Sequence, residues 1–114
     1  MFESMTNANT DVIQGTLDML ILKTLSLRPL HGFGIARRVE QITDGVFKVN
    51  PGSLLTALQR LERAGLLDSE WCQTENSRKA KFYTLTAAGR KQLAAEKEHW
   101  SRITAGINRV LAAS

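Results

Sequence analysis

Cysteine is nearly absent from this 114-residue sequence, since Cys72 is the only one, and no intrachain disulfide can form. A small fold held together by disulfides is therefore excluded. Long apolar runs are missing too, because Asp18 and Lys23 interrupt the most apolar stretch, residues 17–27, which is too short to cross a bilayer. With no apolar signal segment at the N-terminus, these absences predict a cytoplasmic protein that does not span a membrane.

The residue clusters that carry catalysis are missing as well. The two histidines and the single cysteine do not occur at metal-ligand spacing. The sequence has neither a glycine-rich phosphate loop nor the G-x-S-x-G motif of a serine nucleophile. His31 stands alone near the expected start of a helix, where a capping or packed histidine is far more common than a base. We therefore predict no enzymatic activity, no cofactor and no metal site.

Positive charge is concentrated in the middle of the chain. Residues 1–45 hold 4 Lys/Arg and 5 Asp/Glu, residues 46–91 hold 8 and 4, and residues 92–114 hold 3 and 2. A local basic excess is typical of a surface that binds a polyanion such as double-stranded DNA. The overall net charge of +4 is also compatible with a protein that only needs solubility.

The clearest expected element is a helix bounded by Asn50 and Gly65. Pro51 suits the first helical position because it has no N–H to leave unpaired, and Asn50 before it is a good N-cap. Gly65 favours the left-handed conformation that commonly ends a helix. The apolar side that would dock on a core is formed by Leu54, Ala57, Leu58 and Leu61.

The outer side of this helix carries arginine, amide and hydroxyl groups, which suit the reading of base edges in DNA. A solvated helix surface with ordinary charges is the alternative interpretation. The candidate DNA contacts on and beside this helix are Asn50, Ser53, Leu55, Thr56, Gln59, Arg60 and Arg63.

A β-hairpin is expected after this helix. Residues 66–71 and 80–85 have the alternation and aromatic content of strands, and the residues from Cys72 to Ala80 predict a long polar tip. Three cations of the tip and its returning strand, Arg78, Lys79 and Lys81, are candidate contacts to DNA phosphates or to a narrow minor groove.

A long amphipathic helix is expected from Ala87 to about Leu111, with Thr86 as its N-cap. At about 1.5 Å per residue it would extend some 35 Å, further than a domain of this size covers by itself. Its apolar seam therefore predicts a homodimer, together with an apolar first helix that ends near Leu27. The seam consists of Leu93, Trp100, Ile103, Ile107 and Val110.

Three helices followed by a basic hairpin are the element order of a winged helix-turn-helix domain, in which the hairpin is the wing. We expect a mainly α fold with a small β-hairpin. Residues 12–86 would form the winged helix-turn-helix domain, and residues 87–114 the C-terminal dimerisation helix. The third helix would enter the major groove.

Five short motifs in this order resemble the PadR family of bacterial transcriptional regulators. They are residues 30–35 (LHGFGI), 50–54 (NPGSL), 57–62 (ALQRLE), 80–83 (AKFY) and 85–90 (LTAAGR). The resemblance covers roughly residues 12–95, and the single C-terminal helix resembles the short subgroup. It implies a dimeric, sequence-specific DNA-binding regulator, often a repressor of a pseudo-palindromic operator that a small-molecule effector releases.

Four positions depart from the usual family pattern. Leu55 replaces an aromatic residue, most often Tyr, and Thr56 replaces Pro; Phe33 stands where Tyr is common, and Ser77 where the wing often has Gly. The loss of a hydroxyl at Leu55 would change which sequence is bound, or would place an apolar side chain on a thymine methyl.

Two alternatives stay open. A winged helix can serve as a protein-interaction or adaptor module, in which the third helix and the wing would be apolar and neutral. Trp100 would either pack the dimer seam or, by resemblance to relatives that hold aromatic effectors between subunits, line a ligand pocket; packing is favoured because no polar groups converge on it.

Overall fold

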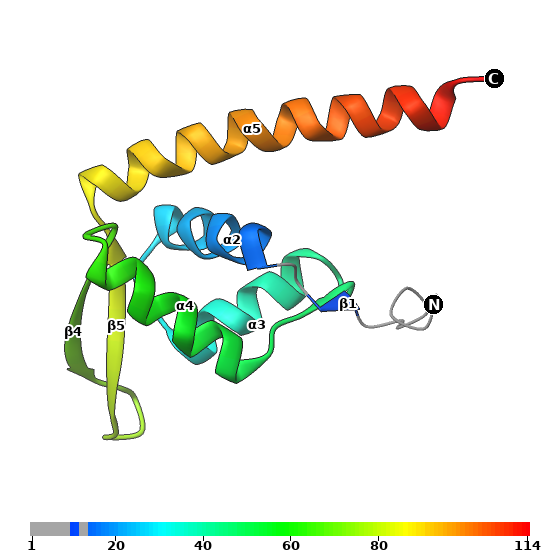
Figure 1. Cartoon of the computed structure of the whole chain (residues 1–114). Coiled ribbons are helices and arrows are strands. Elements are labelled where there is room, and N and C mark those ends of the chain that lie inside the picture. The colour runs from blue at the N-terminus through cyan, green and yellow to red at the C-terminus, as the bar shows by residue number, and fades with distance from the viewer. Residues whose placement is uncertain (1–9, 12–13) are drawn as a thin grey trace.

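The structure is a computed structural model that describes residues 10–11 and 14–114, with side chains from Thr16 onward. Four described helices and five short strands follow one another along the chain (Figure 1). Their bounds are β1 Thr10–Asp11, α2 Gln14–Leu27, β2 Leu30–His31, α3 Gly32–Ile42, β3 Phe47–Lys48, α4 Pro51–Arg63, β4 Leu67–Gln73, β5 Lys79–Leu85 and α5 Ala87–Ala112.

Helix α4 begins and ends where its local sequence predicts. Asn50 is the N-cap, and its side-chain Oδ1 accepts the N–H of Ser53 at 3.0 Å. Pro51 is the first helical residue, and Gly65 adopts a φ of +79° just after the helix. These contacts satisfy end groups that a helix cannot pair internally, which is why the two boundaries were readable from the sequence.

Helix α2 lies at the centre of the core. It runs between α5 on one side and the pair α3 and α4 on the other (Figure 1). Ile21 and Leu22 are fully buried, and they belong to the same core cluster as equally buried side chains from α3, α4 and β4. Apolar residues around most of its circumference are thus explained by partners on more than one side. The fully buried core residues from those three elements are Ile35, Leu58 and Leu67.

The hairpin β4–β5 belongs to a three-stranded antiparallel sheet of order β2-β5-β4. The third strand, β2, pairs Leu30 with Tyr83 and was not expected, because Pro29 and Gly32 flank it. A further parallel pair joins β1 to β3. Strand β2 ties the segment between α2 and α3 to the hairpin and so fixes the base of the wing.

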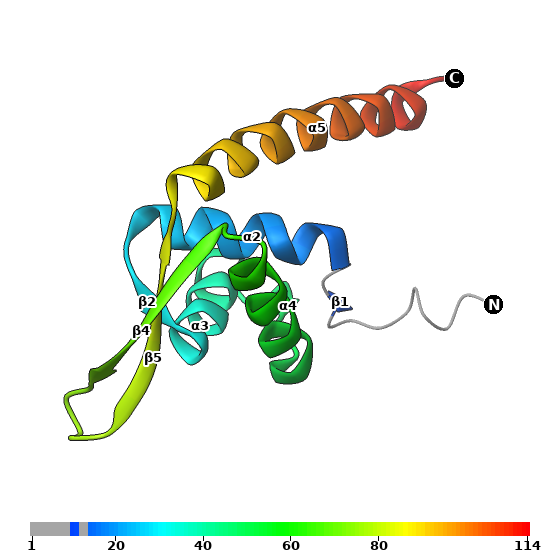
Figure 2. The same ribbon diagram turned by 60° about the vertical axis from the view of Figure 1, so that its left-hand side comes forward.

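The expected nine-residue tip of the hairpin is wrong. Strand pairing continues to Cys72 opposite Ala80 and Gln73 opposite Lys79, so only residues 74–78 form the turn. The turn is closed by the N–H of Thr74, which donates to the carbonyl of Arg78 at 2.6 Å, and Ser77 has a φ of +59°. Polar residues misled the prediction because the hairpin extends beyond the helices (Figure 2), where a strand has no core beneath it and does not need buried apolar residues.

Helix α5 starts as predicted and then leaves the body of the molecule. Thr86 caps it, since its Oγ1 accepts the N–H of Gly89 at 2.9 Å. The first turns pack on α2, and the later turns project away from the other elements (Figures 1 and 2). Leu93, expected in a dimer seam, is only 8% exposed and belongs to the intrachain core, which corrects that assignment.

Candidate nucleic-acid interface

The surface of α4 opposite the core is polar and exposed. Leu54, Ala57, Leu58 and Leu61 bury one side of the helix. Thr56, Gln59 and Arg63 lie on the opposite side and are exposed, as are Ser53 and Asn50 at the N-terminal end. Only part of the Asn50 side chain is available to a partner, because its Oδ1 already accepts the N–H of Ser53 as the helix cap. This surface matches the expected reading surface except at one residue.

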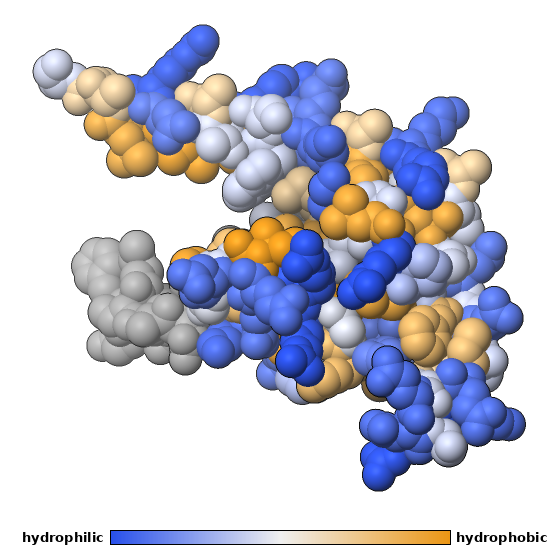
Figure 3. Space-filling view, turned by 180° about the vertical axis from the view of Figure 1, so that it is seen from behind, coloured by the Kyte–Doolittle hydropathy of each residue, from blue (hydrophilic) through white to orange (hydrophobic). Residues whose placement is uncertain are grey.

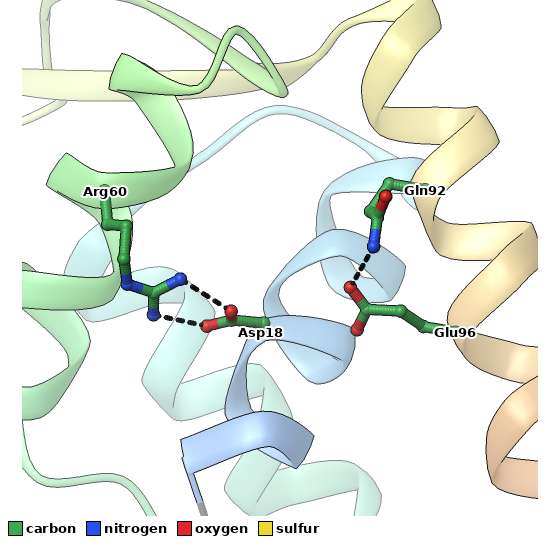
Figure 4. A network of polar contacts seen from close by, with 4 residues as sticks. All are labelled: Asp18, Arg60, Gln92 and Glu96. Carbon is green, nitrogen blue, oxygen red and sulfur yellow. Dashed lines mark hydrogen bonds and ion pairs between the residues drawn. The ribbon is translucent and has the colours of Figure 1, made fainter.

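The exception is Arg60, which was expected beside Thr56 and Gln59. Its guanidinium instead forms a bidentate ion pair with Asp18 of α2, with Nη1–Oδ2 at 2.7 Å and Nη2–Oδ1 at 2.8 Å (Figure 4). The hydrogen bond to Asp18 raises the pKa of Arg60, and the nearby charge of Glu96 on α5 adds to that effect. Glu96 itself accepts a hydrogen bond from Gln92 at 2.9 Å.

Helical geometry explains why Arg60 reaches α2. Arg60 lies at the flank of α4, between its buried and exposed sides, so its side chain can reach α2. Asp18 was the signal that the sequence offered, because a lone acid in an otherwise apolar central helix requires a partner. A cation that satisfies Asp18 is not available to base edges in this conformation.

Lys81 lies on the returning strand β5 as expected, but its ammonium is directed to α4. Its ammonium lies 3.1 Å from Glu62 Oε1 at the C-terminal end of α4 and 5.6 Å from the centre of the Tyr83 ring. Glu62 also accepts a hydrogen bond from the hydroxyl of Ser69 at 2.6 Å. The bond from Ser69 and then that from Lys81 lower the pKa of Glu62, and the bond to Glu62 raises the pKa of Lys81.

The contacts of Glu62 link both strands of the wing to α4. Ser69 lies on β4 and Lys81 on β5, so one carboxylate fixes the hairpin relative to the helix. The inward orientation of Lys81 has a simple cause. In a strand, residues two apart share a face, and Tyr83 two positions later is buried, so Lys81 had to point inward at the base of the wing.

The cations at the tip remain exposed. Arg78 closes the turn and Lys79 begins β5, and neither has an acidic partner within 4 Å in the described part of the chain. A groove of about 1290 Å³ lies between the wing and the N-terminal ends of α3 and α4. Besides Arg78 and Lys79, its lining includes Arg28 and Arg37. These two cations were not among the DNA contacts predicted from the sequence.

Two exposed apolar side chains, Leu55 and Phe33, lie in the same groove. Leu55 is 53% exposed at the edge of α4, and Phe33 stacks on His31 with ring centres 6.3 Å apart. His31 acts as the N-cap of α3 by accepting the N–H of Gly34 at Nδ1, 3.0 Å away. The lining of the groove thus combines cations with exposed apolar side chains, as a surface that receives both phosphates and base or sugar edges would.

The outer half of α5 presents the rest of the expected seam. Trp100, Ile103, Ile107 and Val110 are exposed, and Val110 is 75% exposed. Hydrophobic colour follows the side of this helix that looks back toward the body of the molecule (Figure 3). Leu111, also exposed, extends this surface and was not selected from the sequence. A contiguous apolar strip on a projecting helix is typical of a protein-interaction surface.

These features define a class of protein. A helix pair α3 and α4 packed on α2, followed by an antiparallel hairpin whose strands are bound to the end of α4, is a winged helix-turn-helix. Residues 21–95 match the Transcriptional regulator PadR-like family. The chain therefore belongs to this family, as its motifs indicated, and the members of this family are regulators of transcription that are generally not enzymes.

Solved structures agree with this assignment. A PadR family transcription regulator from Clostridium difficile R20291 is 28% identical, with a TM-score of 0.73 over 84% of this chain and 98% of that chain. A PadR family transcriptional regulator from Eggerthella lenta DSM 2243 is 29% identical, with a TM-score of 0.74 over 89% of this chain and 86% of that chain.

A protein of unknown function from Lysinibacillus sphaericus is also similar, with 24% identity over 82% of this chain and 86% of its own length. In the part of the chain that the structure describes, no helix combines the length and the apolar character needed to span a bilayer.

Proposed function

We propose that this protein is a sequence-specific regulator of transcription that binds double-stranded DNA as a homodimer. The observation that carries the proposal is the exposed polar surface of α4, formed by Thr56, Gln59 and Arg63, beside a wing whose tip cations Arg78 and Lys79 are exposed. Neutral, apolar surfaces at these two places would have favoured the adaptor alternative.

The two elements have different tasks in this proposal. Helix α4 lies in the major groove, where Gln59 and Thr56 have the donors and acceptors needed to distinguish base pairs. Arg78 and Lys79 on the wing bind phosphates or a narrow minor groove, which adds affinity for every sequence. Arg60 and Lys81 hold α4 and the wing in position through Asp18 and Glu62 and make no direct contact with bases.

Dimerisation through the outer half of α5 completes the site. The seam residues Trp100, Ile103, Ile107 and Val110 are 38–75% exposed in the single chain, so a second α5 would bury them further. Two copies related by a two-fold axis would present two α4 helices to half-sites about 34–36 Å apart, which predicts a pseudo-palindromic operator.

Repression and release by a small molecule belong to the proposal through the family resemblance. A dimer bound at an operator blocks a promoter, and a molecule inserted between the α5 helices would change the separation of the two α4 helices. A reporter gene downstream of the selected operator, with and without the regulator, tests the sign of regulation. Higher expression in the presence of the protein would contradict repression.

Selection of bound duplexes from a random DNA pool tests the central claim. We expect enrichment of an inverted repeat with half-sites about one helical turn apart. Sedimentation of the same preparation at micromolar concentration should give a dimer. If the preparation contains folded dimer and no duplex is enriched, DNA recognition is refuted and the adaptor alternative is favoured.

A further inference from the structure

Trp71 is a large aromatic side chain left in solvent at the middle of β4. It is 67% exposed, although it lies on a regular strand with continuous pairing from Leu67 to Gln73. From the sequence, Trp71 indicates only that this segment forms a strand. The candidate nucleic-acid interface described above does not include it. An indole held at a fixed position offers a wide apolar surface and one N–H donor to a partner.

The strand register shows which face of the hairpin carries Trp71. Trp71 lies opposite Lys81, and Ser69 lies opposite Tyr83, without an interruption of the pairing. Residues opposite one another, or two apart on a strand, share a face. Because Ser69 and Lys81 both bind Glu62 of α4, Trp71 is on the face of the wing that looks toward α4. It lies level with Lys81 and two residues beyond Ser69, in the direction of the tip.

Charge is sorted between the two faces of the hairpin. The acids of β4, Asp68 and Glu70, are opposite Thr84 and Phe82 and therefore occupy the face away from Trp71. The cations of β5 share the face of Trp71, because Lys81 is its direct partner and Lys79 lies opposite Gln73. Glu62 of α4 is paired with Lys81, so Lys79 supplies the positive charge of this face that has no acidic partner within 4 Å among the described residues. An aromatic side chain near this cation, on a face without strand acids, fits a polyanionic partner.

We propose that Trp71 contacts the sugar–phosphate backbone of the duplex that α4 reads; this inference rests on the function proposed above. The wing projects beyond α3 and α4 (Figure 2), so a duplex lying on α4 would pass along this face. The indole N–H donates to a phosphate oxygen, and the ring lies against a deoxyribose. Trp71 thereby extends the DNA contact from the tip of the wing toward its base.

Such a contact has a signature that separates it from a lysine contact. An indole carries no charge, so it releases no counterion, and its loss lowers affinity without changing the salt dependence. We expect Trp71→Ala to weaken binding about tenfold on selected and scrambled duplexes alike, with the wild-type salt slope. Trp71→Phe keeps a ring but loses the N–H and should lose less. Thr84→Ala, exposed on the opposite face, is the control and should bind as the wild type does.

Iodide quenching of tryptophan fluorescence tests the same contact in the unmodified protein. Addition of the selected duplex should protect part of the wild-type emission from iodide, and the Trp71→Phe protein should show no such protection. This measurement does not depend on whether Trp71→Ala folds normally.

The outcomes separate this inference from the proposed function. The Trp71 contact is refuted if Trp71→Ala binds as tightly as the wild type, or if bound DNA does not reduce iodide quenching of the wild-type emission. Neither result contradicts DNA recognition by α4. If the wild type binds no duplex at all, both ideas fail together. A changed salt slope in Trp71→Ala would show that the variant acts through the neighbouring lysines, which also contradicts a direct contact.

Discussion

Replacing Arg60 with alanine removes one partner of the ion pair with Asp18 and leaves an acid between α2 and α4. The side chain of Asp18 is 17% exposed and that of Arg60 is 43% exposed. Solvent-exposed ion pairs contribute about 0.2–1 kcal/mol to stability. A shielded polar group that loses its partner costs about 1–3 kcal/mol. Because water reaches the Arg60 side of the pair, we expect a loss of about 1–2 kcal/mol in the free energy of unfolding.

Urea and thermal unfolding at one fixed protein concentration measure this loss. For a chain of this length each kcal/mol corresponds to about 3–6 °C in Tm. Arg63→Ala is the matched control, because Arg63 is an exposed arginine of the same helix and has no acidic partner in the part of the chain described. It should change stability by less than about 0.5 kcal/mol. Asp18→Asn combined with Arg60→Ala should cost less than the sum of the two single changes.

DNA binding supplies the second readout, at a temperature where both variants are folded. Arg60→Ala should keep the wild-type ratio of affinities for selected and scrambled duplexes, whereas Arg63→Ala should lose affinity. The structural role would be refuted by an Arg60→Ala protein that unfolds like the wild type but no longer discriminates between the two duplexes. That result would mean that Arg60 contacts base edges directly.

Three further predictions address the reading surface, the dimer and the start of α5. Gln59→Ala should weaken binding to the selected duplex by about 1–3 kcal/mol and hardly affect scrambled DNA, whereas Lys79→Ala should weaken both and reduce the salt slope by about one. Mobility-shift titrations in salt distinguish them, and an interchange of the two patterns would mean that the roles are reversed. Trp100→Ala should shift the dimer toward monomer in sedimentation at micromolar concentration; a wild type that is itself a stable monomer would contradict this. Gly89→Ala should destabilise the fold by more than about 2 kcal/mol, because a Cβ there would overlap the carbonyl oxygen of Leu66. An unchanged melting temperature would show that α5 docks differently.

The start of helix α4 and the glycine that follows its end could be predicted because they are set by local chemistry. The Asn50 cap, the proline at the first position and the positive φ of Gly65 each involve neighbours in the chain. Its buried side followed from apolar spacing alone. The N-caps of α3 and α5, His31 and Thr86, have the same local origin.

The partners of Arg60 and Lys81 could not be read in this way. Asp18 is 42 residues from Arg60 in sequence, and only the packing of α2 against α4 brings them together. Glu62 and Lys81 meet because the hairpin folds back on the helix that precedes it. A helical projection shows which side of α4 a residue occupies but not which neighbouring element approaches that side, so flanking charges were mistaken for outward ones.

Leu93 illustrates a different limit. Its spacing to Trp100 fits one apolar seam along α5. The spacing of apolar residues does not show where the intrachain core ends and an intermolecular surface begins. The structure divides it between Leu93, buried against the body, and Trp100, exposed on the projecting half. The same ambiguity affected the hairpin, where strands continued into polar residues once no core lay beneath them.

The two ion pairs flank the surface that α4 presents to solvent. Arg60 fixes one flank to α2 through Asp18, and Glu62 fixes the other flank to the wing through Ser69 and Lys81. Gln59 lies between them on a helix whose position is set on both sides before any DNA is bound. Fewer side chains and less of the hairpin then have to be ordered on binding, which lowers the entropic cost of association. In the proposed function, Arg60 and Lys81 therefore contribute to recognition without touching bases, because they fix the position from which Gln59 would reach the base edges.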